Sequence, residues 1–242
     1  MRRLPVVKPS DTIYVIVVLS ATVVFLWLPS TTPELVKNFD REGGSVELLS
    51  AIFYLVGLLA CLYRIVGKVP YHRPYLYLWA ILCFLFFGEE TSWLQHIIGY
   101  GTPDAIREVN VQGEFNLHNL LEDGSWHEAL TSGKLDYKMF LSTTALFRLG
   151  FLTYFLLIPV IMRAGLFKGP RRRLKMPLPA VGFIVSLIAT LSLSLLGYYF
   201  NPELRMDLTE AREMYYALFI MLYVLFYSGT KNGLDPESDP AS

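Results

Sequence analysis

Six long apolar segments alternate with polar connections along the chain. They span about residues 11–28, 46–66, 74–93, 141–162, 178–200 and 213–227. Each approaches the ~20 residues that a helix needs to cross ~30 Å of hydrocarbon. A helix is also the only open-chain structure that satisfies its own backbone polar groups in lipid. The pattern predicts an all-α polytopic membrane bundle of six transmembrane helices, formed by a single domain over residues 1–230 and followed by a disordered cytoplasmic tail over residues 231–242.

The composition agrees with the membrane class. Hydrophobic residues make up 53% of the 242 residues, and the mean hydropathy is +0.41, which exceeds the usual apolar share of a soluble domain. The net charge of zero gives no reason to expect a nucleic-acid partner. Both cysteines, Cys61 and Cys83, lie inside apolar segments, so we expect small core side chains and not a disulfide or a zinc cluster. No small-residue cleavage site follows the first segment, which favours an uncleaved helix over a signal peptide.

Basic residues indicate the orientation. If the N-terminus is cytoplasmic, thirteen of the 21 lysines and arginines lie on the inner side and seven on the outer side, with Arg148 inside a helix. The cluster Arg171–Lys175 lies in a short connection, where the excess of positive charge on the cytoplasmic side is most reliable. Only four of the 21 acidic residues fall on that inner side. The sequence therefore predicts cytoplasmic termini and an outer face that carries most of the acidic residues.

The longest connection, residues 95–138, lies on the outer side. Thr102 and Pro103 form a good helix start, with threonine at the N-cap and proline at the first helical position. We expect short interfacial helices over residues 105–109, 114–121 and 126–130. These would lie over the outer end of the bundle, at the level where tryptophan and tyrosine are enriched.

Polar side chains gather where the third segment ends and this connection begins. The segment closes on adjacent carboxylates, Glu89 and Glu90, and carrying such charge into a membrane is costly enough to indicate a function. At ~100° per residue, one helix face carries Glu89, Ser92, Trp93 and His96. The candidate catalytic residues are Glu89, Glu90, His96 and His118, and the candidate substrate-binding residues are Trp93, Gln95, Asn116, Asn119 and Arg148.

Three interpretations of this polar stretch remain open. In the first, a divalent metal such as Zn²⁺, Mn²⁺ or Fe²⁺ is bound by ligands drawn from Glu89, His96, Glu114 and His118, with Glu90 as an alternative, because imidazole and carboxylate suit these ions. In the second there is no metal; a glutamate acts as general base on water, a histidine carries the proton and asparagines stabilise an oxyanion. In the third, the polar groups neutralise one another and hold the helix end to the loop.

Arg148 lies about two turns into the fourth apolar segment. An arginine inside a membrane usually pairs with a carboxylate, and Glu47, Glu89, Glu90 and Glu213 are within reach at the same depth. The alternative is that its planar fork receives a phosphate or carboxylate from a lipid-like substrate.

Two motifs resemble known families. Residues 88–95 have the pattern Gly-Glu-Glu-x-Ser-Trp-x-Gln, and residues 110–119 have the pattern Asn-x-Gln-Gly-Glu-x-Asn-Leu-His-Asn. Both resemble motifs of a family of uncharacterised bacterial multi-pass membrane proteins, which implies a membrane protein but no particular activity. The adjacent glutamates also resemble those of the CAAX-protease-like glutamate intramembrane proteases. Here no arginine follows Glu90 at the expected place, and Phe115 and His118 are one residue too close for that pattern, so this second likeness is an analogy of chemistry alone.

The sequence thus favours a multi-pass protein of the bacterial inner membrane with a Glu/His/Asn site on the extracytoplasmic side. The leading hypothesis is a hydrolase or group transferase that acts on a lipid or on another membrane-embedded substrate. The alternative is a non-enzymatic membrane subunit that binds an ion, a lipid or a partner protein. Membrane lipids are the expected surroundings in both cases.

Overall fold

The computed structural model describes residues 9–37, 39, 44–67, 73–107, 110, 113–116, 143–164 and 178–226. Every regular element in this part of the chain is a helix. The first half contains a nearly continuous helical run and two long helices, namely α1 (Pro9–Thr22), η1 (Val23–Trp27), α2 (Leu28–Thr31), α3 (Pro33–Val36), α4 (Ser45–Val66) and α5 (Arg73–Glu90). Three short elements follow α5, namely η2 (Ser92–Leu94), α6 (Gln95–Ile98) and α7 (Asp104–Arg107).

The described residues of the second half form one interrupted helix and two long ones. These are α10 (Thr143–Leu152), η3 (Thr153–Leu157), α11 (Ile158–Arg163), α13 (Val181–Phe200), η4 (Pro202–Leu204) and α14 (Arg205–Phe226). The expected helices at 114–121 and 126–130 lie mostly outside the described residues, and Glu114 and Phe115 form a bend. The short helix expected at 105–109 is present as α7.

Two of the helical runs contain a wide turn of π-helix directly before a proline. In η1 the Leu28 N–H donates to the Val23 carbonyl, and Pro29 follows. In η3 the Ile158 N–H donates to the Thr153 carbonyl, and Pro159 follows. Because proline lacks an N–H and its ring crowds the preceding turn, a local widening lets each helix continue.

Among the described residues, four helices are long and apolar enough to cross a membrane, so the protein is membrane-integral. They cover Asp11–Thr31, Ser45–Val66, Ala145–Arg163 and Val181–Phe200. Large apolar side chains point outward along them, for example Ile16, Leu59 and Leu149, which are more than half exposed. Such surfaces fit lipid and not water. The helices α5 and α14 do not meet the same criterion, so a count of six spanning helices stays a prediction.

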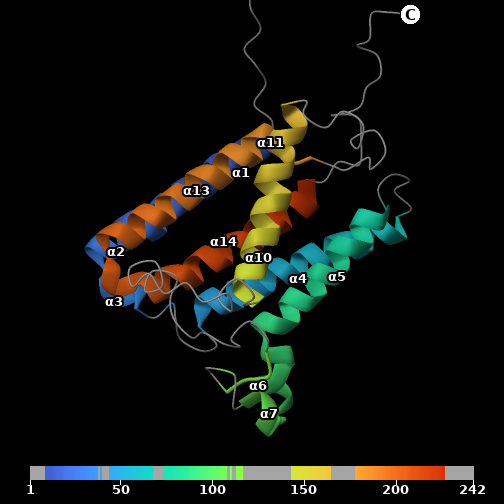
Figure 1. Cartoon of the computed structure of the whole chain (residues 1–242), viewed down its shortest axis with the longest axis vertical. Helices are drawn as coiled ribbons and strands as arrows, with labels where there is room; N and C mark the ends of the chain where they lie inside the picture. The colour runs from blue at the N-terminus through green and yellow to red at the C-terminus, as the bar shows by residue number, and fades with distance from the viewer. Residues whose placement is uncertain are drawn as a thin grey trace, which may run out of the picture.

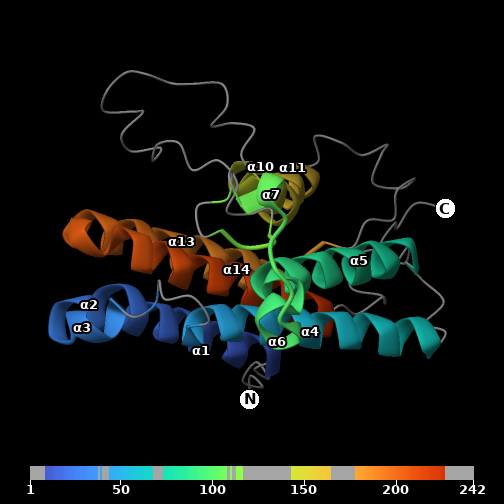
Figure 2. The same ribbon diagram turned by 90° about the horizontal axis from the view of Figure 1, so that it is seen from below.

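The long helices form a bundle around α14. In Figure 1 α1 runs beside α13, while α4 runs beside both α5 and α14, and these pairs make the most extensive helix contacts. Figure 2 shows α1 and α4 on one side, α10 and α11 on the opposite side, and α13, α14 and α5 between them. The approach of α13 to the first run is close, because a Cβ on Gly197 would lie 2.7 Å from the Phe25 carbonyl oxygen.

The centre of the bundle is aromatic. Trp79 from α5, Tyr154 and Phe155 from the α10–α11 run, Phe183 from α13 and Tyr223 from α14 form edge and tilted ring contacts with centroids 5.0 to 6.2 Å apart. The Tyr154 and Tyr223 hydroxyls share a hydrogen bond of 2.8 Å, which satisfies two polar groups in an apolar place.

The helix α14 begins earlier than its apolar pattern indicates. The sequence predicts a start near residue 213, whereas the structure has Arg205 as the first residue. Leu208, Ala211 and Tyr215 in this first part are buried, so one apolar face continues beneath the charged residues. The additional turns bring Arg205 and Arg212 into contact with Tyr198 of α13.

Candidate polar site at the end of α5

The backbone adopts a left-handed helical conformation just after α5. Ser92, Trp93 and Leu94 have φ values of 44°, 55° and 64°, so they form a left-handed turn made of three residues that are not glycine. A left-handed conformation costs an L-residue roughly 1–2 kcal/mol, and a run of three needs support from elsewhere. The sequence-based expectation that Glu89, Trp93 and His96 share one helix face therefore does not apply, because the right-handed helix ends at Glu90.

Two hydrogen bonds from one tyrosine support the left-handed turn. The Tyr100 hydroxyl lies 3.1 Å from both the Ser92 and the Trp93 carbonyl oxygens. The Leu94 N–H also donates to the Thr91 carbonyl at 2.8 Å. These contacts pair backbone groups that the end of α5 would otherwise leave without partners.

The Trp93 side chain folds back onto α5. A Cβ placed on Gly88 would lie 2.8–2.9 Å from three carbon atoms of the Trp93 ring, so only glycine leaves room for the indole here. The indole Nε1 donates to Glu89 Oε1 at 3.0 Å. The left-handed turn thereby fixes the orientation of the Glu89 carboxylate.

A distant part of the chain, residues 110 and 113–116, packs against the left-handed turn; we call it the docking segment. Ser92 Oγ donates to Glu114 Oε2, and Asn116 Nδ2 donates to Ser92 Oγ at 3.0 Å and to Glu114 Oε2 at 3.1 Å. Asn110 closes the group, with Nδ2 2.8 Å from Asn116 Oδ1 and 3.0 Å from the Asn116 carbonyl oxygen. All four side chains are buried.

Two further features fix the geometry of the docking segment. Gly113 has a φ of 70°, in the region that favours glycine, and the Glu114 N–H donates to Asn110 Oδ1 at 3.2 Å. Gln95 links both sides, because its Oε1 accepts from the Phe115 N–H and its Nε2 donates to Thr102 Oγ1, each at 2.8 Å. Both sequence motifs are thus joined by hydrogen bonds between their polar residues.

A small cavity of about 180 Å³ lies between the turn, α7 and the docking segment. Its lining consists of Glu89, Trp93, Ile106, Phe115 and Asn116. The walls are mainly apolar, and Glu89 is the ionisable group among them. Since a water molecule occupies ~30 Å³ in the liquid, the cavity holds a group the size of a lipid headgroup fragment and not a whole lipid.

The structure brings together only part of the predicted site. Glu89, Trp93, Gln95, Glu114 and Asn116 belong to one connected region around the turn and the cavity. Glu90 lies elsewhere, near enough to Tyr54 of α4 to interact with its phenol electrostatically. His118 and Asn119 lie outside the described residues, and so does the side chain of His96.

A metal centre is not visible in the described part of the chain, where no three His, Cys, Asp or Glu side chains form a cluster suited to an ion. Two of the four expected ligands, His96 and His118, are not among the side chains that the structure places. The metal interpretation therefore stays a prediction.

Arg148 pairs with a carboxylate, as one of the two sequence-based interpretations has it. Its Nη2 donates to Glu213 Oε1 of α14 at 2.7 Å, and both side chains are about three-quarters buried. This ion pair joins α10 to α14, outside the Glu89 cavity. It does not bring Arg148 into the lining of the Glu89 cavity.

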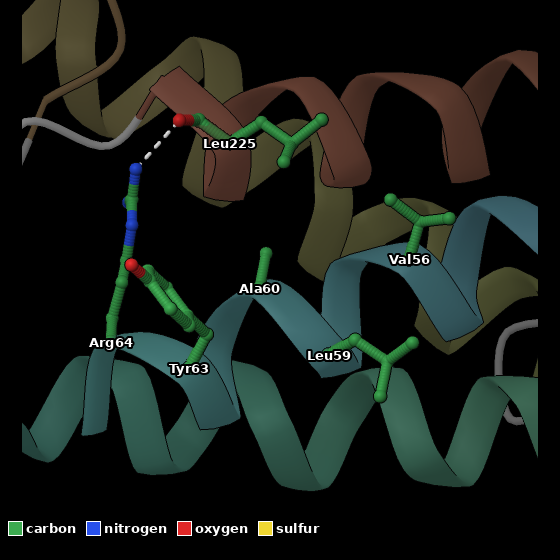
Figure 3. A pocket seen from close by; sticks show the side chains of 6 residues that line it. All are labelled: Val56, Leu59, Ala60, Tyr63, Arg64 and Leu225. Carbon is green, nitrogen blue, oxygen red and sulfur yellow. Dashed lines mark hydrogen bonds between the residues drawn. The ribbon is translucent and has the colours of Figure 1, made fainter. Parts of the chain in front are cut away.

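A second, larger cavity of about 440 Å³ lies at the opposite end of α4. Figure 3 shows its lining along one face of α4, with Arg64 reaching across to the end of α14 (the full lining is Val56, Leu59, Ala60, Tyr63, Arg64 and Leu225). The Arg64 guanidinium donates to the Val224 and Leu225 carbonyl oxygens, each at 2.6 Å. A cation at these carbonyls complements the helix end, so this groove has the features of a helix contact and not of a reactive site.

Comparison with protein family models, with curated proteins and with solved structures finds no match. The polar site must therefore be interpreted from its own geometry.

Several residues that build the site did not stand out as candidates. Gly88 and Asn110 belong to the two motifs, which was the one available signal for them. Ser92 was expected on the face of Glu89 but was not named as a binding or catalytic residue. Tyr100 and Thr102 carried no signal of a role in the site, because their partners lie in the turn and in Gln95.

Proposed function

We propose that the Glu89 cavity receives the polar part of a membrane-embedded substrate and that Glu89 acts on it as a general base in hydrolysis or group transfer. The observation that carries the proposal is a carboxylate held in a fixed orientation against an apolar cavity. Burial in apolar surroundings is the usual means of tuning a carboxylate for proton transfer near neutral pH.

The surroundings of Glu89 support a preorganised role. The Trp93 indole holds one carboxylate oxygen at 3.0 Å, and Trp93 itself lies in a strained turn that the docking segment and Tyr100 stabilise. Strain of this kind persists where the surrounding structure fixes it, and it is concentrated at functional sites. Asn116, which also lines the cavity, presents a polar group opposite apolar walls.

The place of the cavity in the fold supports a lipid-like substrate. The cavity lies just beyond the end of α5, in a protein that has helices apolar enough to span lipid. With the orientation that the basic residues favour, this end faces the extracytoplasmic side of a bacterial inner membrane. A lipid headgroup at that level reaches the cavity without leaving the bilayer.

A second candidate is a non-enzymatic subunit that binds a lipid or a partner protein through the same end. It is favoured by the way Ser92, Glu114, Asn110 and Asn116 use their hydrogen-bonding groups on one another. A network of this kind stabilises a docked loop, and Glu89 is the charged group of the cavity lining that a ligand would contact.

The test compares cells that lack the native protein and carry the wild type, Glu89→Gln or Glu203→Gln. The first variant keeps an acceptor for Trp93 but loses the charge, and the second removes an exposed carboxylate on η4. Membrane lipids and co-purified lipids are measured by mass spectrometry, and thermal unfolding checks that the proteins are folded.

We expect a lipid species to accumulate with Glu89→Gln alone and to co-purify with that variant. Unchanged membrane lipids, together with loss of a co-purified lipid from Glu89→Gln, would support the non-enzymatic subunit. Identical membrane and co-purified lipids in all three strains would refute a role of Glu89 in either function.

A further inference from the structure

We propose that Arg148 and Arg212 form a binding site for a phosphate group between α10, α13 and α14, separate from the Glu89 cavity. The inference starts from two arginines that lie at one end of the bundle and are incompletely paired. For each, the Nε atom is buried and has no hydrogen-bond partner.

The positive charge of Arg212 is less well compensated than that of Arg148. Its guanidinium carbon lies 5.0 Å from the centroid of the Tyr198 ring. Among the described residues it makes no ion pair. A cation–π contact is weaker than the cost of removing a guanidinium from water, so the stacking on Tyr198 does not by itself explain why a charge is held here.

The acidic residues of α14 do not neutralise this position. Glu213 is the partner of Arg148 at 2.7 Å. At ~100° per residue, Asp207 and Glu210 lie roughly 140–160° around the helix from Arg212, on another face. Glu213 therefore compensates Arg148, and among the described residues no carboxylate forms an ion pair with Arg212.

Neighbouring groups add to the positive and polar character. Arg205 lies on the same face of α14 and donates from Nε to the Tyr198 carbonyl at 3.5 Å. Both Arg148 and Arg212 are close enough to Tyr216 to interact with its phenol electrostatically. The Tyr198 hydroxyl donates to Thr209 Oγ1 at 2.9 Å, since Thr209 uses its own proton on the Arg205 carbonyl.

Phosphate is the ligand class that this arrangement fits. Arginine has a planar fork of donors that matches phosphate oxygens in pairs, and both free Nε positions belong to such forks. Arg148 lies in the first turn of the apolar span Ala145–Arg163, a position close to the level of lipid headgroups. The phosphate could come from a phospholipid or from solution, and the experiment separates the two.

The test uses the full-length protein, freed of lipid and held in dodecyl maltoside, whose headgroup contains no phosphate. Thermal unfolding is followed while inorganic phosphate, phosphatidylglycerol or the uncharged monogalactosyl diacylglycerol is added at constant ionic strength. Native mass spectrometry counts the bound lipids in parallel. The variants are Arg212→Gln, Arg212→Lys and, as a matched control, Arg107→Gln, because Arg107 is exposed and pairs with the exposed Asp104.

We expect phosphatidylglycerol to stabilise the wild type and Arg107→Gln, and galactolipid to do so far less. The loss of one charged hydrogen-bonding group should raise the concentration that Arg212→Gln needs by on the order of tenfold or more, with Arg212→Lys between them. Stabilisation by inorganic phosphate as well would identify a site for free phosphate. The proposal is refuted if neither phosphate source binds to the wild type, or raises its unfolding temperature, more than galactolipid does. It is also refuted if phosphatidylglycerol stabilises Arg212→Gln as much as Arg107→Gln. The wild-type measurements decide the question even if Arg212→Gln fails to fold.

Discussion

Replacing Gly88 by alanine tests the packing of Trp93 that underlies the candidate site. The new Cβ would lie 2.8 Å from two ring carbons and 2.9 Å from a third, roughly 0.7 Å closer than carbon atoms normally approach. The indole cannot simply swing away, because its Nε1 is bonded to Glu89 and its backbone is part of the left-handed turn. Overpacking of this kind costs ~1–3 kcal/mol, and a lost hydrogen bond to a charged group costs about as much.

Alanine also has an advantage of ~1 kcal/mol over glycine inside a helix. We therefore expect Gly88→Ala to lower the free energy of unfolding by about 1–5 kcal/mol after this gain is included. The measurement is unfolding in mixed micelles, followed by far-ultraviolet circular dichroism. Gly150→Ala is the matched control, because nothing lies within 4 Å of a Cβ there; it should be neutral or stabilising by up to ~1 kcal/mol.

The decisive comparison is made in a Trp93→Ala background. Without the indole, Gly88→Ala should cost nothing and gain up to ~1 kcal/mol. If Gly88→Ala is as stable as the wild type, or loses the same stability with and without Trp93, the indole does not pack on Gly88 as described.

Two more predictions concern the polar contacts. Asn116→Ala removes a partner from Ser92, Glu114 and Asn110 at once, and we expect it to lower the free energy of unfolding by about 1–3 kcal/mol. The control Ser30→Ala, at an exposed hydroxyl, should leave the free energy of unfolding unchanged. Equal stability of the two variants would contradict a stabilising role of these hydrogen bonds. Arg148→Met leaves Glu213 part-buried without its cation and should cost about 3 kcal/mol, while Arg148→Met combined with Glu213→Met should recover most of that loss. A double variant with the full sum of both single losses would show that the two charges are not coupled.

The long helices could be predicted because their apolar runs are uninterrupted. For α4 the expected range, 46–66, differs from Ser45–Val66 by one residue, since Gly44 and Gly67 bound an apolar run. The start of α14 could not be predicted in this way. Its first turns carry Arg205 and Arg212 on one face, and the apolar face beneath them is too narrow to raise the local hydropathy.

The polar stretch was recognisable as a site, but its internal arrangement was not. Adjacent carboxylates at a helix end are a property of the sequence itself. The left-handed turn has no such signal, because none of Ser92, Trp93 and Leu94 is a residue type that favours positive φ. Its partners, Glu114 and Asn116, are more than twenty residues away, so local propensity contains no information about them.

The left-handed turn has a consequence for how the protein is made. Left alone, the chain after Glu90 would continue as a right-handed helix toward Ile98, because each of the three left-handed residues carries an energetic penalty. The contacts that outweigh this penalty come from Tyr100 and from the docking segment, which emerge later in synthesis. In a nascent chain, α5 would then extend toward Ile98 until Tyr100 and Asn116 have been synthesised, so the shape of the Glu89 cavity depends on residues that follow the turn in the sequence.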